Sequence, residues 1–173
     1  GFSASGNPMA ALQVAGPAAA GAPAGGVLVR WRFRAGTTAP LTLQVLRPAG
    51  GGAYQVVEES SSATPASGGD VTSVALRLPI AAGDRLGVRA PGDLTALAAT
   101  PAPLGEHVAV FDPVPAVAST ATPSSPYDFR LLSQGDVEPD ADADGYGDVS
   151  QDTCPFDAAR HSVSGLFDSL AHT

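Results

Sequence analysis

The feature that most constrains the fold of this chain is a series of short runs in which apolar and polar side chains alternate. The clearest run covers residues 27–34. Alternation with a period of two is the pattern of a half-buried β-strand, and so regular a run predicts that Trp31 is a core residue. The pattern predicts one face made of Val27, Val29, Trp31 and Phe33, and another made of Leu28, Arg30, Arg32 and Arg34.

Similar runs recur along the chain and are separated by glycine and proline. They predict strands at residues 41–47, 54–58, 73–80, 85–90, 107–111 and 127–133. Successive strands with such separators favour an all-β fold with antiparallel pairing. We therefore expect a two-sheet, jelly-roll-like sandwich over residues 27–134, with a closed barrel as the alternative.

The first 26 residues are mostly Ala, Gly and Pro and show little periodicity. Leu12 and Val14 could lie on a short edge strand, but Pro17 and Pro23 prevent a longer element. The chain opens at Gly1 without an initiator Met or the apolar core of a signal peptide. This leads us to expect a mature or excised fragment.

Length and charge narrow the functional classes. A chain of 173 residues suits one domain, and its net charge of −8 argues against nucleic acid and anionic membranes as partners. No apolar run approaches the length of a membrane-spanning helix. We therefore expect neither nucleic-acid binding nor membrane insertion.

A different pattern covers residues 135–157. Asp140, Asp142 and Asp144 alternate, Gly145 follows them, and further aspartates come behind. Calcium binds six to eight oxygen ligands, and alternate residues of a tight loop can turn their side chains toward one point. Glycine lets the backbone fold back with a positive φ. The predicted ligands are Asp140, Asp142, Asp144, the carbonyl of Tyr146, Asp148 and Asp152.

Residues 140–155 resemble a thrombospondin type 3 repeat, the Asp-rich motif that ends in Asp-x-Cys-Pro and also occurs in linkers of bacterial cell-envelope proteins. The repeat usually places its closing Asp at position twelve, where this chain has Gln151, and Asp152 and Cys154 each come one place late. Gln151 or Asp152 could close the shell, and we favour Asp152 because a carboxylate binds calcium better than an amide does. Cys154, the only cysteine, is free or pairs with another chain.

Two alternatives to this interpretation remain. An EF-hand uses a similar loop, but Pro155 stands where its exiting helix should run. A solvated acidic tail would also be rich in aspartate. The segments GGVLVRWRFRAG and LPIAAGDRLGV are similar to β-sandwich domains that precede such calcium tails in secreted proteins of GC-rich bacteria. This resemblance implies an extracellular or cell-surface location.

Two functions follow as expectations. The first is a structural or adhesive module of the cell surface, stiffened by calcium and in contact with another protein chain or a glycan. The second is a carbohydrate-binding module with a structural calcium ion, which would need exposed aromatic side chains. The candidates for these are Tyr54, Tyr127 and Tyr146.

We do not expect an enzyme. The three histidines have no partners at metal-ligand spacing, and the chain has no nucleophile elbow or phosphate-binding loop. These histidines are His107, His161 and His172. Residues 158–173 predict at most a weak helix, through Leu166, Phe167 and Leu170, and fraying is the alternative.

Overall fold

The computed structural model of the chain describes residues 8–16, 19–92, 94–101, 105–124 and 126–162. In these ranges it contains β-strands and the short 3-10 helix η2 (Leu94–Ala96) but no α-helix, and no helix is long and apolar enough to span a membrane. The strands are β1 (Met9–Ala15), β2 (Gly26–Arg34), β3 (Thr42–Gly50), β4 (Ala53–Glu59), β5 (Val71–Ile80), β6 (Arg85–Ala90), β7 (Ala99–Pro101), β8 (His107–Phe111), β9 (Thr120–Ala121), β10 (Phe129–Leu131) and β11 (Ser133–Glu138).

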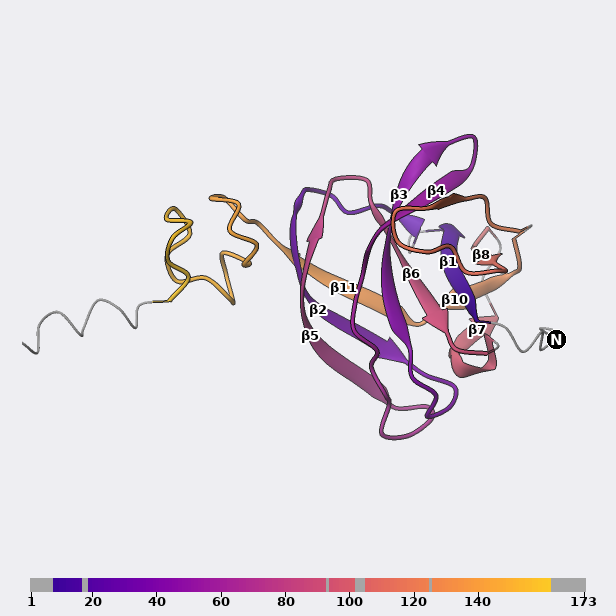
Figure 1. The fold of residues 1–173 in the computed structure, drawn as a ribbon. Helices are drawn as coiled ribbons and strands as arrows, with labels where there is room; N and C mark the ends of the chain where they lie inside the picture. Colours follow the sequence, from indigo (N-terminus) through magenta and orange to yellow (C-terminus); the bar gives the residue numbers. More distant parts are fainter. Residues whose placement is uncertain (1–7, 17–18, 93, 102–104, 125, 163–173) are drawn as a thin grey trace, which may run out of the picture.

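The strands form antiparallel sheets that pack against each other (Figure 1). A six-stranded sheet has the order β8-β1-β6-β3-β4-β9, a three-stranded sheet the order β11-β2-β5, and β10 pairs with β7. All of the pairings described for these strands are antiparallel. This confirms the predicted all-β, antiparallel class and is consistent with a β-sandwich. The jelly-roll-like topology stays a prediction.

The main core lies between the three-stranded sheet and the middle of the six-stranded one. Trp31 is fully buried there and stacks on Phe33, with 4.0 Å between the ring centroids. The indole Nε1 of Trp31 donates to Oγ of Ser133 at 3.0 Å, which satisfies its one polar atom. The predicted core position of Trp31 is therefore confirmed. Other members of this core are Leu28, Leu43, Val45, Leu76, Ile80, Val88 and Ala90.

The predicted faces of β2 are wrong at its start. In its pairing with β11, Arg30 lies opposite Asp136 and Leu28 opposite Val137, so Val29 is an extra residue in β2, which is the mark of a β-bulge. A bulge moves the alternation by one residue, so Leu28 joins Trp31 in the core instead of sharing a face with the arginines. Val29 is also buried, and its Cγ1 lies against Gly147 of the Asp-rich loop.

The strand at Leu12 and Val14 exists but does not lie at an edge. It is β1, and it pairs with β6 on one side and with β8 on the other. Its residues are buried on both faces, since Met9 belongs to one apolar cluster and Leu12 to another. Small alanines between them allow this close packing, whereas prolines outside the strand limit only its length.

The last predicted strand, residues 127–133, is divided into β10 and β11 at Leu132. β11 continues to Glu138 and pairs with β2 along its length, so it leads directly from the sandwich into the Asp-rich loop. Residues 153–162 of the tail are turns and irregular structure. The weak helix predicted through Leu166, Phe167 and Leu170 lies outside the described residues.

Candidate metal centre

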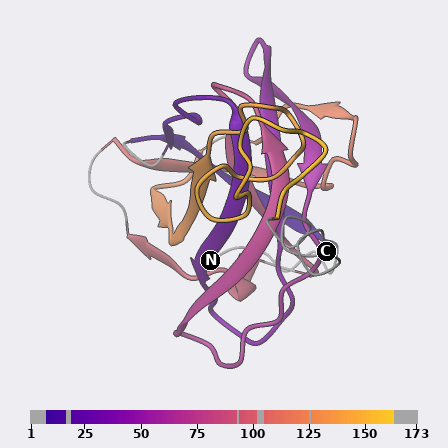
Figure 2. The same ribbon diagram turned by 90° about the vertical axis from the view of Figure 1, so that its left-hand side faces the viewer.

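The Asp-rich loop leaves the end of β11 and is drawn in orange to yellow in Figure 1; Figure 2 views the molecule from the side of this loop. Pro139 directly follows the strand, and its carbonyl accepts the N–H of Asp148 at 2.9 Å. This bond closes residues 139–148 into a compact turn. The predicted ligands that alternate along the sequence are therefore held in one small volume.

Asp140, Asp142 and Asp144 come together as the spacing predicts. Each offers a carboxylate oxygen, and these oxygens all lie within 4.8 Å of one another. Such a group can hold a metal ion. Gly145 has a φ of 84°, the left-handed conformation expected at the turn, and Ala143 adopts a similar φ of 61°.

Backbone amides fix one side of this triad. Asp140 accepts from the N–H of Asp144 at 3.1 Å through Oδ1 and from that of Gly145 at 3.0 Å through Oδ2. Asp142 accepts from Asp144 N–H through Oδ1, and Asp144 accepts from Tyr146 N–H at 2.8 Å. These bonds leave the second oxygen of Asp142 and of Asp144 free of backbone donors.

Three carboxylate oxygens near the triad are buried without a hydrogen-bond partner. They are Oδ2 of Asp142, of Asp144 and of Asp152. The Asp152 side chain is the most enclosed, because the residue is only 4% exposed and its Oδ1 accepts from Cys154 N–H at 2.7 Å. Buried carboxylate oxygens without donors are rare and costly in folded proteins. A cation bound at the triad would provide a partner for the oxygens of Asp142 and Asp144.

The electrostatics of the loop point the same way. Burial raises the pKa of Asp142, and the negative charges of Asp144, Asp152 and Asp140 raise it further, against the lowering effect of the Asp144 amide. Asp152 is therefore close enough to act on Asp142, although it lies outside the tighter triad. Among the ion pairs of the described residues, none involves these four aspartates.

Gln151 and Asp152 have different roles in the structure. Both atoms of the Gln151 amide are occupied: Oε1 accepts from Gly147 N–H at 3.2 Å and Nε2 donates to the carbonyl of Leu76 at 2.7 Å. Asp152 instead keeps one buried oxygen without a partner. Of the two residues, Asp152 is thus the one with an unoccupied side-chain oxygen, and its closing of a metal shell stays a prediction.

The two remaining predicted ligands lie differently. The carboxylate of Asp148 accepts from Ala141 N–H, at 3.2 Å to both oxygens, and is not part of the triad. The Tyr146 ring stacks on His161 with 4.2 Å between centroids. Coordination by Asp148 and by the Tyr146 carbonyl stays a prediction.

The elements around the loop differ from those of an EF-hand. A β-strand precedes it, and residues 153–162 after it contain no helix. Cys154 is free and partly buried among the described residues, and its backbone, not its thiol, contacts Asp152. The loop therefore stands without the flanking helices that hold an EF-hand site.

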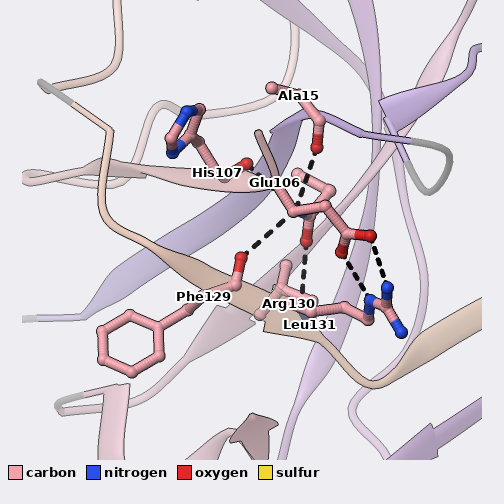
Figure 3. A network of polar contacts seen from close by, with 7 residues as sticks. Ala15, Glu106, His107, Phe129, Arg130 and Leu131 are labelled. Carbon is pink, nitrogen blue, oxygen red and sulfur yellow. Dashed lines mark hydrogen bonds and ion pairs between the residues drawn. The ribbon is translucent and has the colours of Figure 1, made fainter. Parts of the chain in front are cut away.

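A cleft of about 890 Å³ between the sheets is the other candidate site. Figure 3 shows a polar network that includes lining residues of this cleft, in which both oxygens of Glu106 accept from Arg130. The amide of Gln13 donates to the carbonyls of Ala15, His107 and Phe129 and accepts from Leu131 N–H. These groups tie β1, β8 and β10 together, so the network serves the fold.

The tyrosines considered for sugar binding do not form a platform. Tyr54 is only 9% exposed and packs edge-on against Phe111, at 6.4 Å between centroids. Tyr127 is bridged to β8, while Tyr146 lies in the Asp-rich loop. A carbohydrate would therefore find no shared face made of these three rings.

No family model, no curated protein and no solved structure matches this chain. The residues of the Asp-rich loop and their geometry are therefore what indicates a function.

Proposed function

We propose that the chain is a calcium-binding structural module of a secreted or cell-surface protein, in which the ion stiffens the Asp-rich loop after the sandwich. The observation that carries the proposal is the set of buried, unpartnered oxygens of Asp142, Asp144 and Asp152 beside the acidic triad. The resemblance of residues 140–155 to a thrombospondin type 3 repeat supports the same function.

The donor set favours calcium among the common metals. The clustered ligands are carboxylates, which suit hard cations, and neither cysteine nor histidine belongs to the cluster found among the described residues. Magnesium requires near-octahedral geometry at short distances, whereas calcium accepts larger and less regular shells. An irregular loop with several carboxylates is therefore better suited to calcium.

Extracellular modules of this type bind calcium with a Kd of about 10⁻⁴–10⁻³ M. At about 1 mM calcium, a Kd of about 10⁻⁴ M would stabilise the bound state by about 1.4 kcal/mol. That free energy is enough to order a loop but small beside the stability of a domain. The ion would thus stiffen the Asp-rich loop, which lies between the sandwich and a partner that is another protein chain or a glycan.

Calorimetric titration tests the proposal. Calcium added to the full chain should give a saturable binding heat. The double variant Asp142→Asn, Asp144→Asn should lose this heat, because two of the three carboxylates with an unpartnered oxygen become neutral amides. Asp157→Asn is the matched control, since Asp157 is exposed and lies outside the cluster. A wild-type titration as flat as that of the double variant would contradict the proposal.

The carbohydrate-binding alternative has weaker support, because Tyr54 is buried and the cleft's polar network is committed to the fold. A glycan array with the full chain distinguishes the two functions. Specific retention of a glycan that survives calcium chelation would favour the alternative.

A further inference from the structure

The second half of the Asp-rich loop, residues 147–152, lies directly on the three-stranded sheet. Gly147 is buried at the point of contact: a Cβ on it would lie 2.6 Å from Val29 Cγ1 and 2.5 Å from Glu138 Oε2. Only a residue without a side chain allows this approach. The N–H groups of Gln151 and Asp152 both donate to the Gly147 carbonyl, at 3.0 and 2.9 Å, so the contact is continuous with the turn that carries Asp152.

Two side chains fasten this turn to the sandwich. Gln151 bridges from Gly147 to the carbonyl of Leu76 in the middle of β5. Glu138, the last residue of β11, accepts through Oε2 from the N–H of Val149 at 3.1 Å and from that of Ser150 at 2.8 Å. The turn is thereby attached to both edge strands of the sheet, since β5 and β11 flank β2.

The first half of the loop also contacts β5. Arg77 follows Leu76 in β5, and its guanidinium carbon lies 4.2 Å from the centroid of the Tyr146 ring. The Tyr146 ring in turn stacks on the His161 ring, with an interplanar angle of 5°. Leu76 and Arg77 therefore contact the loop on both sides of Gly147.

These contacts bear on the metal site because Asp152 is remote from the triad in sequence and adjacent to Gln151. Its N–H donates to the carbonyl of Gly147, the residue packed against Val29, so the docked turn fixes the backbone that carries the Asp152 carboxylate. Groups that orient metal ligands typically contribute tenfold or more to metal affinity. Whatever holds this turn on β5 thus also holds Asp152 beside the triad.

We propose that Gln151 and Glu138 are positioning residues of the metal site, so that metal binding by the loop and its docking on the sandwich stabilise each other. The proposal rests on the proposed calcium function and adds that the sandwich is a part of the site. Linkage makes the coupling reciprocal: what weakens docking weakens calcium binding, and calcium raises the thermal stability of the docked sheet.

The test uses the full chain with Gln151→Ala, which removes both amide contacts and leaves every carboxylate in place. Calorimetry should show calcium binding about tenfold weaker than in the wild type. Ser150→Ala is the matched control, because Ser150 takes part in the contact through its backbone N–H, and this variant should bind as the wild type does. In a thermal melt followed by fluorescence of Trp31, the only tryptophan, calcium should raise the midpoint, and Gln151→Ala should reduce that rise.

The outcomes separate this inference from the function on which it rests. If the wild type binds no calcium, the proposed function itself fails. If the wild type binds calcium and Gln151→Ala gives the same affinity and the same rise in melting midpoint, the coupling is overturned while the metal site stands. Should Gln151→Ala not fold, Glu138→Ala replaces it: loss of the acceptor for the N–H groups of Val149 and Ser150 should weaken calcium binding about tenfold, and an unchanged affinity would overturn the proposal.

Discussion

The sandwich and the Asp-rich loop both bury carboxylates, but the groups around these carboxylates differ between the two regions. In the sandwich, Asp84 is held by two hydrogen bonds from Arg47, both at 2.8 Å, and Glu106 is held in the same manner by Arg130. In the loop, Asp142, Asp144 and Asp152 each keep a buried oxygen without a donor. Buried carboxylates are thus paired with arginine in the sandwich, whereas in the loop they lie close to other carboxylates.

The pKa values follow this difference. Burial alone would raise the pKa of Asp84, but the hydrogen bonds from Arg47 and the Ala81 amide, together with the Arg47 charge, lower it. Hydrogen bonds from Arg130 lower the pKa of Glu106, against the effect of burial. The pKa of Asp142 is raised. Burial of a carboxylate therefore does not decide the direction of its pKa shift by itself; in these three residues the presence or lack of an arginine partner does.

The largest expected effect of this contrast is on stability as a function of pH in calcium-free buffer. Groups with a lowered pKa stabilise the fold above their unfolded value of about 4, and this contribution is lost as the pH falls through their folded values. Asp142 acts in reverse, since its raised pKa costs stability at neutral pH and protonation relieves that cost. The melting midpoint should rise slightly as the pH falls from 7 and should then drop steeply below about pH 4.

Measurement of the Trp31 melting midpoint between pH 7 and pH 3 checks this prediction. Asp142→Asn should abolish the slight rise, and Asp84→Asn should make the acid drop smaller. A midpoint that decreased steadily from pH 7 in both the wild type and Asp142→Asn would show that the loop carboxylates do not repel one another.

A smaller effect is expected from single substitutions at neutral pH. Asp84→Asn breaks the pair with Arg47 and should lower the free energy of unfolding by about 2 kcal/mol, because the Asp84 side chain is only 1% exposed. Asp142→Asn should not lower it in calcium-free buffer, since it removes repulsion. Urea denaturation followed by Trp31 fluorescence compares the two, and equal losses would remove the distinction between the regions.

The sequence predicted the parts of this structure that local patterns encode. Alternation located most of the strands and the burial of Trp31, and contiguous spacing predicted that Asp140, Asp142 and Asp144 would meet. Both signals lie within a few residues of chain. Both signals can be recognised without knowledge of the tertiary fold, because the strand period and the loop geometry are local properties.

What the sequence could not predict depends on distant partners. The interior position of β1 depends on its pairing with β6 and β8, far along the chain. The bulge at Val29 of β2 changes the faces of that strand without a glycine or proline at the bulge to mark it. The docking of the loop relies on a backbone carbonyl, that of Leu76, which no side-chain pattern reveals.

Anomalous diffraction from crystals grown with calcium tests the central claim most directly. If calcium occupies the loop, a single strong anomalous peak should appear at about 2.3–2.6 Å from the Oδ2 atoms of Asp142 and Asp144, with Asp152 completing the same shell. Crystals that contain calcium in excess but show no peak there, with these carboxylates turned toward water or toward arginine, would contradict it.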